Sequence, residues 1–139
     1  MARFKTIEHT ADIGIEVEAD TLEGLFEGAA LGMVSIMADP SRDIGRGTGV
    51  DVSVEAGDIG GLMFEWLNEL IFIMDTEGVL LSGFRVGGIK GLHLEATARG
   101  EEIRQEESRL MTEIKAATFH QLLVEERGGS WFARVIFDV

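Results

Sequence analysis

Residues 13–30 read IGIEVEADTLEGLFEGAA, and the hydrophobic period changes part-way along this stretch. The first part alternates between apolar side chains and glycine or glutamate, which is typical of a strand with one buried face. From Leu22 onward the apolar residues recur at helical spacing, which indicates an amphipathic helix. Asp20 comes three residues before Glu23, so we expect a capping box with Asp20 at the N-cap. The stretch therefore predicts a strand that leads directly into a long helix.

This first helix should end near Asp39 and Pro40, because the residue before a proline avoids the helical region of backbone space. Gly24, Gly28 and Gly32 occur at every fourth position along it. Each glycine weakens a helix by about 1 kcal/mol relative to alanine. We infer that the glycines allow the helix to pack closely on a sheet.

The rest of the chain continues to mix strands and helices without strict alternation. In chain order, the patterns predict a strand at 50–55, a helix that begins after Asp58 and ends at Gly78, strands at 79–86 and 92–99 joined by a glycine-rich connection at 87–91, a strand at 114–124 broken near His120, and a last strand at 131–138. The charged stretch 100–112 reads as a short surface helix or a loop.

This order of elements predicts an α+β fold in a single domain that covers residues 1–139. The last four strands follow one another by short turns, which favours a mostly antiparallel or mixed sheet. We therefore expect a two-layer sandwich in which two long helices pack on one face of that sheet.

The composition is strongly acidic, with 25 Asp and Glu against 12 Lys and Arg and a net charge of −13. Direct binding to DNA or RNA is disfavoured, because it depends on clustered positive charge. Cations and basic protein surfaces are the favoured partners, although the acidity could equally serve solubility alone. The chain has no cysteine and no apolar run long enough to span a membrane, so we expect a cytoplasmic protein without disulfides.

Two common classes of catalytic motif lack support in this sequence. The glycine-rich stretch GRGTG at 45–49 precedes a strand, whereas a dinucleotide fingerprint follows a strand and opens a helix. No serine lies in a G-x-S-x-G context, so a hydrolase is unsupported. His93 falls on the polar face of an alternating strand, where we expect a surface residue.

Polar residues stand at both ends of the chain. His9 and Asp12 precede the first alternating strand, and Asp138 and Val139, which supplies a free α-carboxylate, close the sequence. Two carboxylates together with backbone carbonyls would suit a hard cation such as Ca²⁺ or Mg²⁺. The alternative is a turn aspartate at residue 12 and a solvated aspartate at residue 138. Spacing alone leaves both interpretations open.

Lys115 and His120 lie in the stretch KAATFH, which ends near the predicted strand break. In an extended chain their side chains point to opposite faces. Lys115 could be a solvated strand lysine or a functional cation in an acidic protein. His120 could be a buried imidazole with satisfied hydrogen bonds or a polar contact near the break.

Four stretches together resemble the archease family: HTADIG at 9–14, TLEGLFEGAA at 21–30, EIKAATFH at 113–120 and RVIFDV at 134–139. The resemblance covers essentially the whole chain in the family's order. Phe119 stands where tyrosine is common in the family, and Ala117 where a larger residue is common. Archeases are accessory proteins of the RtcB-type RNA-splicing ligase. They promote its guanylylation and let it turn over repeatedly in tRNA splicing and RNA repair.

The resemblance also implies a site and a partner. The implied cofactor is a divalent cation, described for the family as calcium, and its implied ligands are Asp12, Asp138 and Val139. The chain itself is then not an enzyme, and its partner is an RtcB-type RNA ligase. The residues expected to contact the ligase or to support the site are His9, Lys115 and His120.

Two other functions compete with this interpretation. A general chaperone or modulator of nucleic-acid-processing proteins would carry a purely structural cation and would not depend strictly on Asp12. A metal-dependent enzyme acting on a small molecule would need a deep pocket with a perturbed acid or base near Asp12. His9 and His120 are the only candidates that the sequence offers for that base.

Overall fold

The computed structural model describes residues 2–8, 13–38, 48–102 and 112–139. Within these residues, eight strands form two sheets, and all their pairings are antiparallel. The larger sheet contains β1 (Arg3–Glu8), β2 (Ile13–Ala19), β8 (Ser130–Asp138), β6 (Ala116–Ala117) and β7 (Leu123–Arg127). The smaller sheet contains β3 (Thr48–Glu55), β5 (His93–Glu102) and β4 (Val79–Lys90). The helices are α1 (Leu22–Met37) and α2 (Ile59–Glu77).

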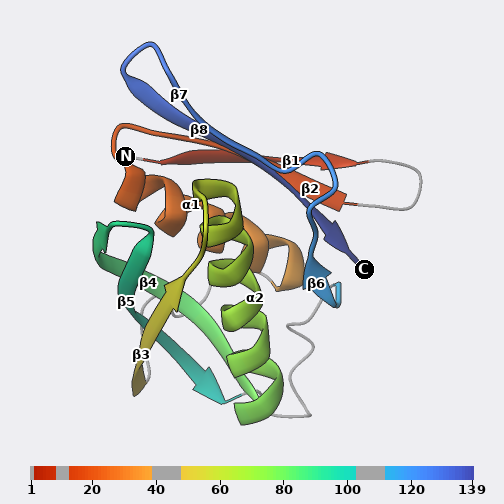
Figure 1. Cartoon of the computed structure of the whole chain (residues 1–139). Coiled ribbons are helices and arrows are strands. Elements are labelled where there is room, and N and C mark those ends of the chain that lie inside the picture. Colours follow the sequence, from red (N-terminus) through yellow and green to blue (C-terminus); the bar gives the residue numbers. More distant parts are fainter. Residues whose placement is uncertain (1, 9–12, 39–47, 103–111) are drawn as a thin grey trace.

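The two helices lie between the two sheets (Figure 1). The predicted α+β sandwich with mostly antiparallel strands and two long helices is confirmed. The layering differs in detail, because the strands divide between two sheets and each sheet carries the helices on one face. The physical reason lies in α1, whose buried side chains surround most of the helix axis. A single sheet could shield only one side of such a helix from water.

The first helix begins at a different cap from the one predicted. Thr21, not Asp20, is the N-cap, and its side-chain oxygen accepts a hydrogen bond of 3.0 Å from the backbone N–H of Gly24. Thr21 is the last residue with extended backbone, so its hydroxyl is the one placed over the first helical turn. The helix ends at Met37, close to the predicted stop.

Close packing of α1 on the larger sheet is confirmed at its glycines. A Cβ atom on Gly28 would lie 2.9 Å from Cγ1 of Val17, and one on Gly32 would lie 3.1 Å from the ring of Phe4. These positions leave no room for a larger side chain without movement of the neighbours. The glycines therefore set the short distance between α1 and strands β1 and β2.

Strand β1 was not predicted from the sequence. It pairs antiparallel with β2, and two ion pairs cross the strands, Arg3 to Glu18 at 2.8 Å and Lys5 to Glu16 at 3.1 Å. The signal was present as basic residues at alternate positions of one segment and acidic residues at alternate positions of the next. Residues 9–12, which include His9 and Asp12, connect these paired strands and lie outside the described residues.

The second helix begins and ends as predicted. Asp58 is its N-cap and accepts a hydrogen bond of 2.6 Å from the backbone N–H of Gly61. Gly78 ends the helix in the left-handed region with φ of 64°.

No helix in the described part of the chain is long and apolar enough to cross a membrane.

The hairpin of the smaller sheet turns later than predicted. Residues 87–90 continue β4, and the turn lies at Gly91 and Leu92, which both have positive φ. The ladder between β4 and β5 shifts register between Val86 and Gly88. There the backbone N–H of Val86 donates to the carboxylate of Glu27 on α1 at 2.8 Å. The backbone N–H at this irregular point of β4 is thus satisfied by a side chain of α1.

The end of the chain follows the predicted pattern of a broken strand. Strands β6 and β7 are separated by a short non-strand segment that contains His120, and Gly128 and Gly129 turn the chain from β7 into β8. In the predicted charged stretch, residues 100–102 belong to β5. Residues 103–111 lie outside the described residues.

Two side chains of α2 tie the layers together by hydrogen bonds. Trp66, which is fully buried, donates from Nε1 to the backbone carbonyl of Phe26 on α1 at 2.9 Å. Asn68 forms a pair of bonds with the backbone of Ala117: its Oδ1 accepts from the N–H at 2.9 Å, and its Nδ2 donates to the carbonyl at 3.2 Å. The Asn68 amide therefore holds β6 against α2 as a neighbouring strand would.

We expect Asn68→Ala to destabilise the protein. Ala117 is buried, and each of its two backbone groups left without a partner should cost about 1–3 kcal/mol. Urea unfolding followed by circular dichroism measures the loss. Thr76→Ala, which removes only local bonds to the carbonyls of Phe72 and Ile73 within α2, is the matched control and should change stability little. Equal losses in the two variants would contradict this role of Asn68.

A second prediction concerns Gly14, which is opposite Ile136 in the larger sheet. A Cβ atom at Gly14 would lie 2.7 Å from the carbonyl oxygen of Val135, so Gly14→Ala must separate β2 from β8. We expect a loss of about 1–3 kcal/mol in the free energy of unfolding. Gly49→Ala should be nearly neutral in the same assay, because its nearest neighbour, on Thr97, is 3.5 Å away.

Candidate functional site

Segments from both ends of the chain meet at one end of the strands in the larger sheet. Ile13, the first residue of β2, is opposite Phe137 of β8, and Asp138 is opposite Ala116 of β6. Strand β8 lies between the other two strands (Figure 1). The predicted ligand Asp138 thus lies on the strand that pairs with the chain segment following Asp12.

Backbone hydrogen bonds fix the KAATFH segment against the end of β8. The N–H of Lys115 donates to the carbonyl of Asp138 at 2.8 Å. The N–H and the hydroxyl of Thr118 both donate to the carbonyl of Ile136, at 3.0 and 2.8 Å. Lys115, His120 and Asp138 are consequently brought to the same end of the sheet, and all three are exposed.

The two described metal-ligand candidates offer oxygen donors. Asp138 is exposed and Val139 is 41% exposed, so the Asp138 carboxylate is accessible from solvent. Oxygen donors are the ligands that a hard cation requires. Within the described residues no group of three or more histidine, cysteine or carboxylate side chains could hold a metal. A complete site therefore needs a further ligand, and the predicted one, Asp12, lies outside the described residues together with His9.

Lys115 and His120 differ in how they are held. The Lys115 side chain is exposed and makes no ion pair with any other residue that the structure describes. His120 is exposed in the turn after β6, where its N–H donates to the hydroxyl of Thr118 at 3.2 Å. This position excludes the buried-imidazole alternative for His120. Both side chains are accessible to a partner, and the His120 ring has a long contact of 3.5 Å with the Gln121 amide.

The sequence did not predict the aromatic stack beside this site. Phe119 is 63% exposed and stacks on Phe64 of α2, with ring centroids 3.9 Å apart and planes 7° from parallel. Such a pair contributes about 0.5–1.5 kcal/mol beyond the area it buries. The stack attaches the turn that carries His120 to α2. The sequence did contain a signal for this stack, because Phe64 and Phe72 fall on the polar side of the second helix.

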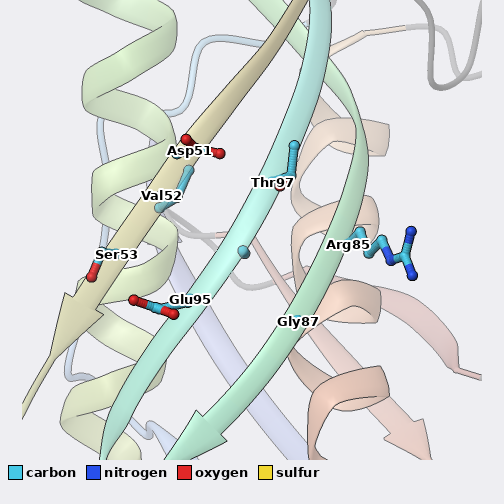
Figure 2. Close-up of a pocket in the computed structure, with 8 residues that line it drawn as sticks. Asp51, Val52, Ser53, Arg85, Gly87, Glu95 and Thr97 are labelled. Carbon is cyan, nitrogen blue, oxygen red and sulfur yellow. The ribbon is translucent and has the colours of Figure 1, made fainter.

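A separate hollow of about 580 Å³ lies on the outer face of the smaller sheet. Figure 2 shows Asp51 and Ser53 on β3, Glu95 on β5 and Arg85 on β4. The Arg85 guanidinium points away from Glu95 and Asp51. The charged groups of this hollow therefore do not converge on one point.

Near this hollow, three side chains follow the order of a hydrolase triad. Ser53 Oγ is 3.3 Å from Nε2 of His93, and a carboxylate oxygen of Glu55 is 4.0 Å from Nδ1. The second distance is too long for a hydrogen bond. The side chains of His93 and Glu55 are 43% and 83% exposed, and Glu95 is 3.5 Å from the same Nε2. This is a group of neighbours on the solvent face, as predicted for His93, and it does not orient a catalytic base.

Comparison with known proteins identifies the family to which this sequence and fold belong. The profile of the archease protein family (MTH1598/TM1083) matches residues 4–139. A protein archease from Methanothermobacter thermautotrophicus is 39% identical over 142 residues, which cover 100% of both chains. A protein archease from Thermococcus gammatolerans is 36% identical over 143 residues, again with 100% of both chains covered.

Two solved structures share the fold. The solution structure of Methanobacterium thermoautotrophicum protein 1598 superposes with a TM-score of 0.84 at 39% identity and covers 98% of each chain. The crystal structure of a Thermotoga maritima protein, described as an archease and possible chaperone, superposes with a TM-score of 0.66 at 28% identity, covering 97% of this chain and 96% of the other. Full-length matches of sequence and fold thus agree, and the chain belongs to the archease family.

Proposed function

We propose that this protein activates an RtcB-type RNA ligase, promoting its guanylylation and its multiple turnover through a divalent-cation site. The observation that carries the proposal is the register of the larger sheet. It sets Ile13 opposite Phe137 and so joins the segment after Asp12 to the segment that carries Asp138. Membership of the archease family supports the same conclusion.

The proposed ligands are Asp12, Asp138 and Val139, and the proposed cation is calcium. The exposed Asp138 supplies the oxygen chemistry that a hard cation needs. When bound, such a cation supplies positive charge that can neutralise phosphate oxygens. Lys115 adds a second positive charge at the same end of the sheet, where it can meet an acidic or phosphorylated group on the ligase.

In this proposal the chain acts as a cofactor protein and carries out no reaction of its own. Its exposed site residues would bind the ligase in the conformation that accepts the guanylyl group, which shifts the population of that conformation. Tenfold stimulation requires a preference of about 1.4 kcal/mol for the competent state. The net charge of −13 favours contact with basic protein surfaces over contact with RNA.

A second candidate function is a general chaperone or modulator of nucleic-acid-processing proteins. The Thermotoga maritima relative is itself described as a possible chaperone. In this alternative the cation is structural. Stimulation would then extend to unrelated client proteins and would not depend on the side chain of Asp12.

The first test is multiple-turnover RNA ligation by the RtcB-type ligase of the same host, with GTP and divalent metal. Catalytic amounts of the wild-type protein should raise the number of turnovers. Asp12→Ala should reduce the rate to that of the ligase alone, because a cation ligand is lost. Asp75→Ala, which changes an exposed aspartate on α2, should stimulate normally. Full stimulation by Asp12→Ala, with far-ultraviolet circular dichroism unchanged, would contradict the assigned site.

Cation binding can be measured without the ligase. Calorimetric titration of the chelator-treated protein with Ca²⁺ should show one site that Asp138→Asn removes and Asp75→Asn keeps. At a free Ca²⁺ concentration 100 times the dissociation constant, the wild-type protein should gain about 2.7 kcal/mol of stability. Equal binding by the wild-type and Asp138→Asn proteins would show that Asp138 is not a ligand.

A further inference from the structure

A groove of about 470 Å³ lies between the edge of β3 and the exposed side of α2. Within the described residues β3 pairs with β5 alone, so its other edge is without a neighbouring strand. The groove is lined by the end of β3 and by α2 residues two and three turns into that helix: Ser53, Val54, Glu55, Glu65, Asn68, Glu69 and Phe72.

The backbone groups that face this open edge can be identified from one hydrogen bond. The N–H of Ala56 donates to the carbonyl of Leu92 at 3.2 Å, so Ala56 directs its backbone groups toward β5. Alternate residues of an antiparallel strand direct these groups to opposite edges. Ser53 and Glu55 therefore present N–H and C=O groups to the groove, whereas Val54 presents its groups to β5.

The side chains around the edge combine an apolar surface with negative charge. Phe72 is 59% exposed, and Val54 beside it is half-buried, unlike the fully packed valine two residues earlier. Glu55, Glu65 and Glu69 add three carboxylates, and among the described residues no lysine or arginine lines the groove. An occupant must therefore supply backbone pairing groups, apolar side chains and positive charge.

We propose that this groove binds an extended, basic segment of a partner protein, which adds to β3 as a further antiparallel strand. Directly opposed residues of an antiparallel pair have their side chains on the same face. Lysine or arginine residues of the segment lie opposite Ser53 and Glu55, on the acidic outer face. The intervening apolar residues lie on the inner face against Val54 and Phe72.

Other occupants fit the groove less well. Two copies of β3 paired antiparallel about Ser53 would place Asp51 of each copy directly opposite Glu55 of the other, and like charges so placed destabilise a sheet. A nucleic acid would bring its phosphates against three carboxylates. The proposal is independent of the ligase function, because it rests on the strand edge and on the charges of the groove alone.

The probe is a fluorescein-labelled, acetylated and amidated hexapeptide that alternates lysine and valine, and its binding to the full chain is followed by fluorescence anisotropy. Two further peptides of identical composition carry N-methyl groups on either the lysine or the valine amides. Lysine N-methylation removes the donors that face β3 and should abolish binding. Valine N-methylation alters amides that point away from β3 and should leave binding within about twofold.

Amide hydrogen exchange locates the bound strand residue by residue. With nine-tenths of the protein occupied, exchange at Ser53 and Glu55 should slow about tenfold, because it proceeds only from the free fraction. Val52 and Val54, whose amides already face β5, should change little. This contrast between alternate residues is specific to strand addition.

Variants of the protein test the side chains. Phe72→Ser should weaken peptide binding roughly tenfold through lost apolar contact. Glu55→Lys should weaken it roughly three- to tenfold, and Glu126→Lys, an exposed change of equal charge on β7, should not. Ser53→Pro removes an N–H that faces the groove, keeps the ladder to β5 and should abolish binding.

Four results would overturn the proposal. These are failure of the alternating peptide to bind, equal binding of the two N-methylated peptides, binding without protection of Ser53 and Glu55, and protection that rises with protein concentration in the absence of peptide. The second result would indicate charge attraction alone. The last would identify a second copy of the chain as the occupant.

Discussion

The paired hydrogen bonds between the Asn68 amide and the backbone of Ala117 hold the candidate site in place. Strand β6 has only two residues, and such a short strand gains little from pairing with β8 alone. Asn68 supplies the donor and acceptor that a second neighbouring strand would have supplied, at 2.9 and 3.2 Å. The position of Lys115 beside Asp138, and of the turn with His120, follows from this attachment.

The helix layer in turn depends on contacts with both sheets. Helix α1 is buried on most sides, so one sheet would have left apolar surface in water. The hairpin of β4 and β5 covers the second side, and Glu27 satisfies the N–H of Val86 at the point where that hairpin loses register. Trp66 joins the two helices by its bond to Phe26. One continuous hydrophobic core therefore supports β6 and β8, the two strands at the candidate site.

Much of this fold follows from local sequence patterns, and the remainder depends on distant contacts. Hydrophobic periods located both helices and most strands, because burial acts on each element separately. The choice of Thr21 over Asp20 as N-cap depended on which residue was the last with extended backbone. Asn68 and Ala117 are 49 residues apart, and no local pattern indicates that an amide will bond to a particular strand. The proposed ligand role of Asp12 rests only on the resemblance of whole motifs to the archease family.

One helix links the two surfaces for which a function is proposed. Phe64 stacks on the turn beside the end of β8, and Phe72 lies in the groove next to β3. These residues are eight positions apart on α2, so they lie about 12 Å apart along its axis. If one partner bound both surfaces, its second segment would bind in an intramolecular step once the first segment was bound. The effective concentration for that step is set by the length of chain between the two segments. A charge change in the groove would then weaken binding of the whole partner without touching the proposed cation site. Loss of Asp138 would instead alter the site and leave the strand-addition groove intact, so the two contributions are separable by experiment.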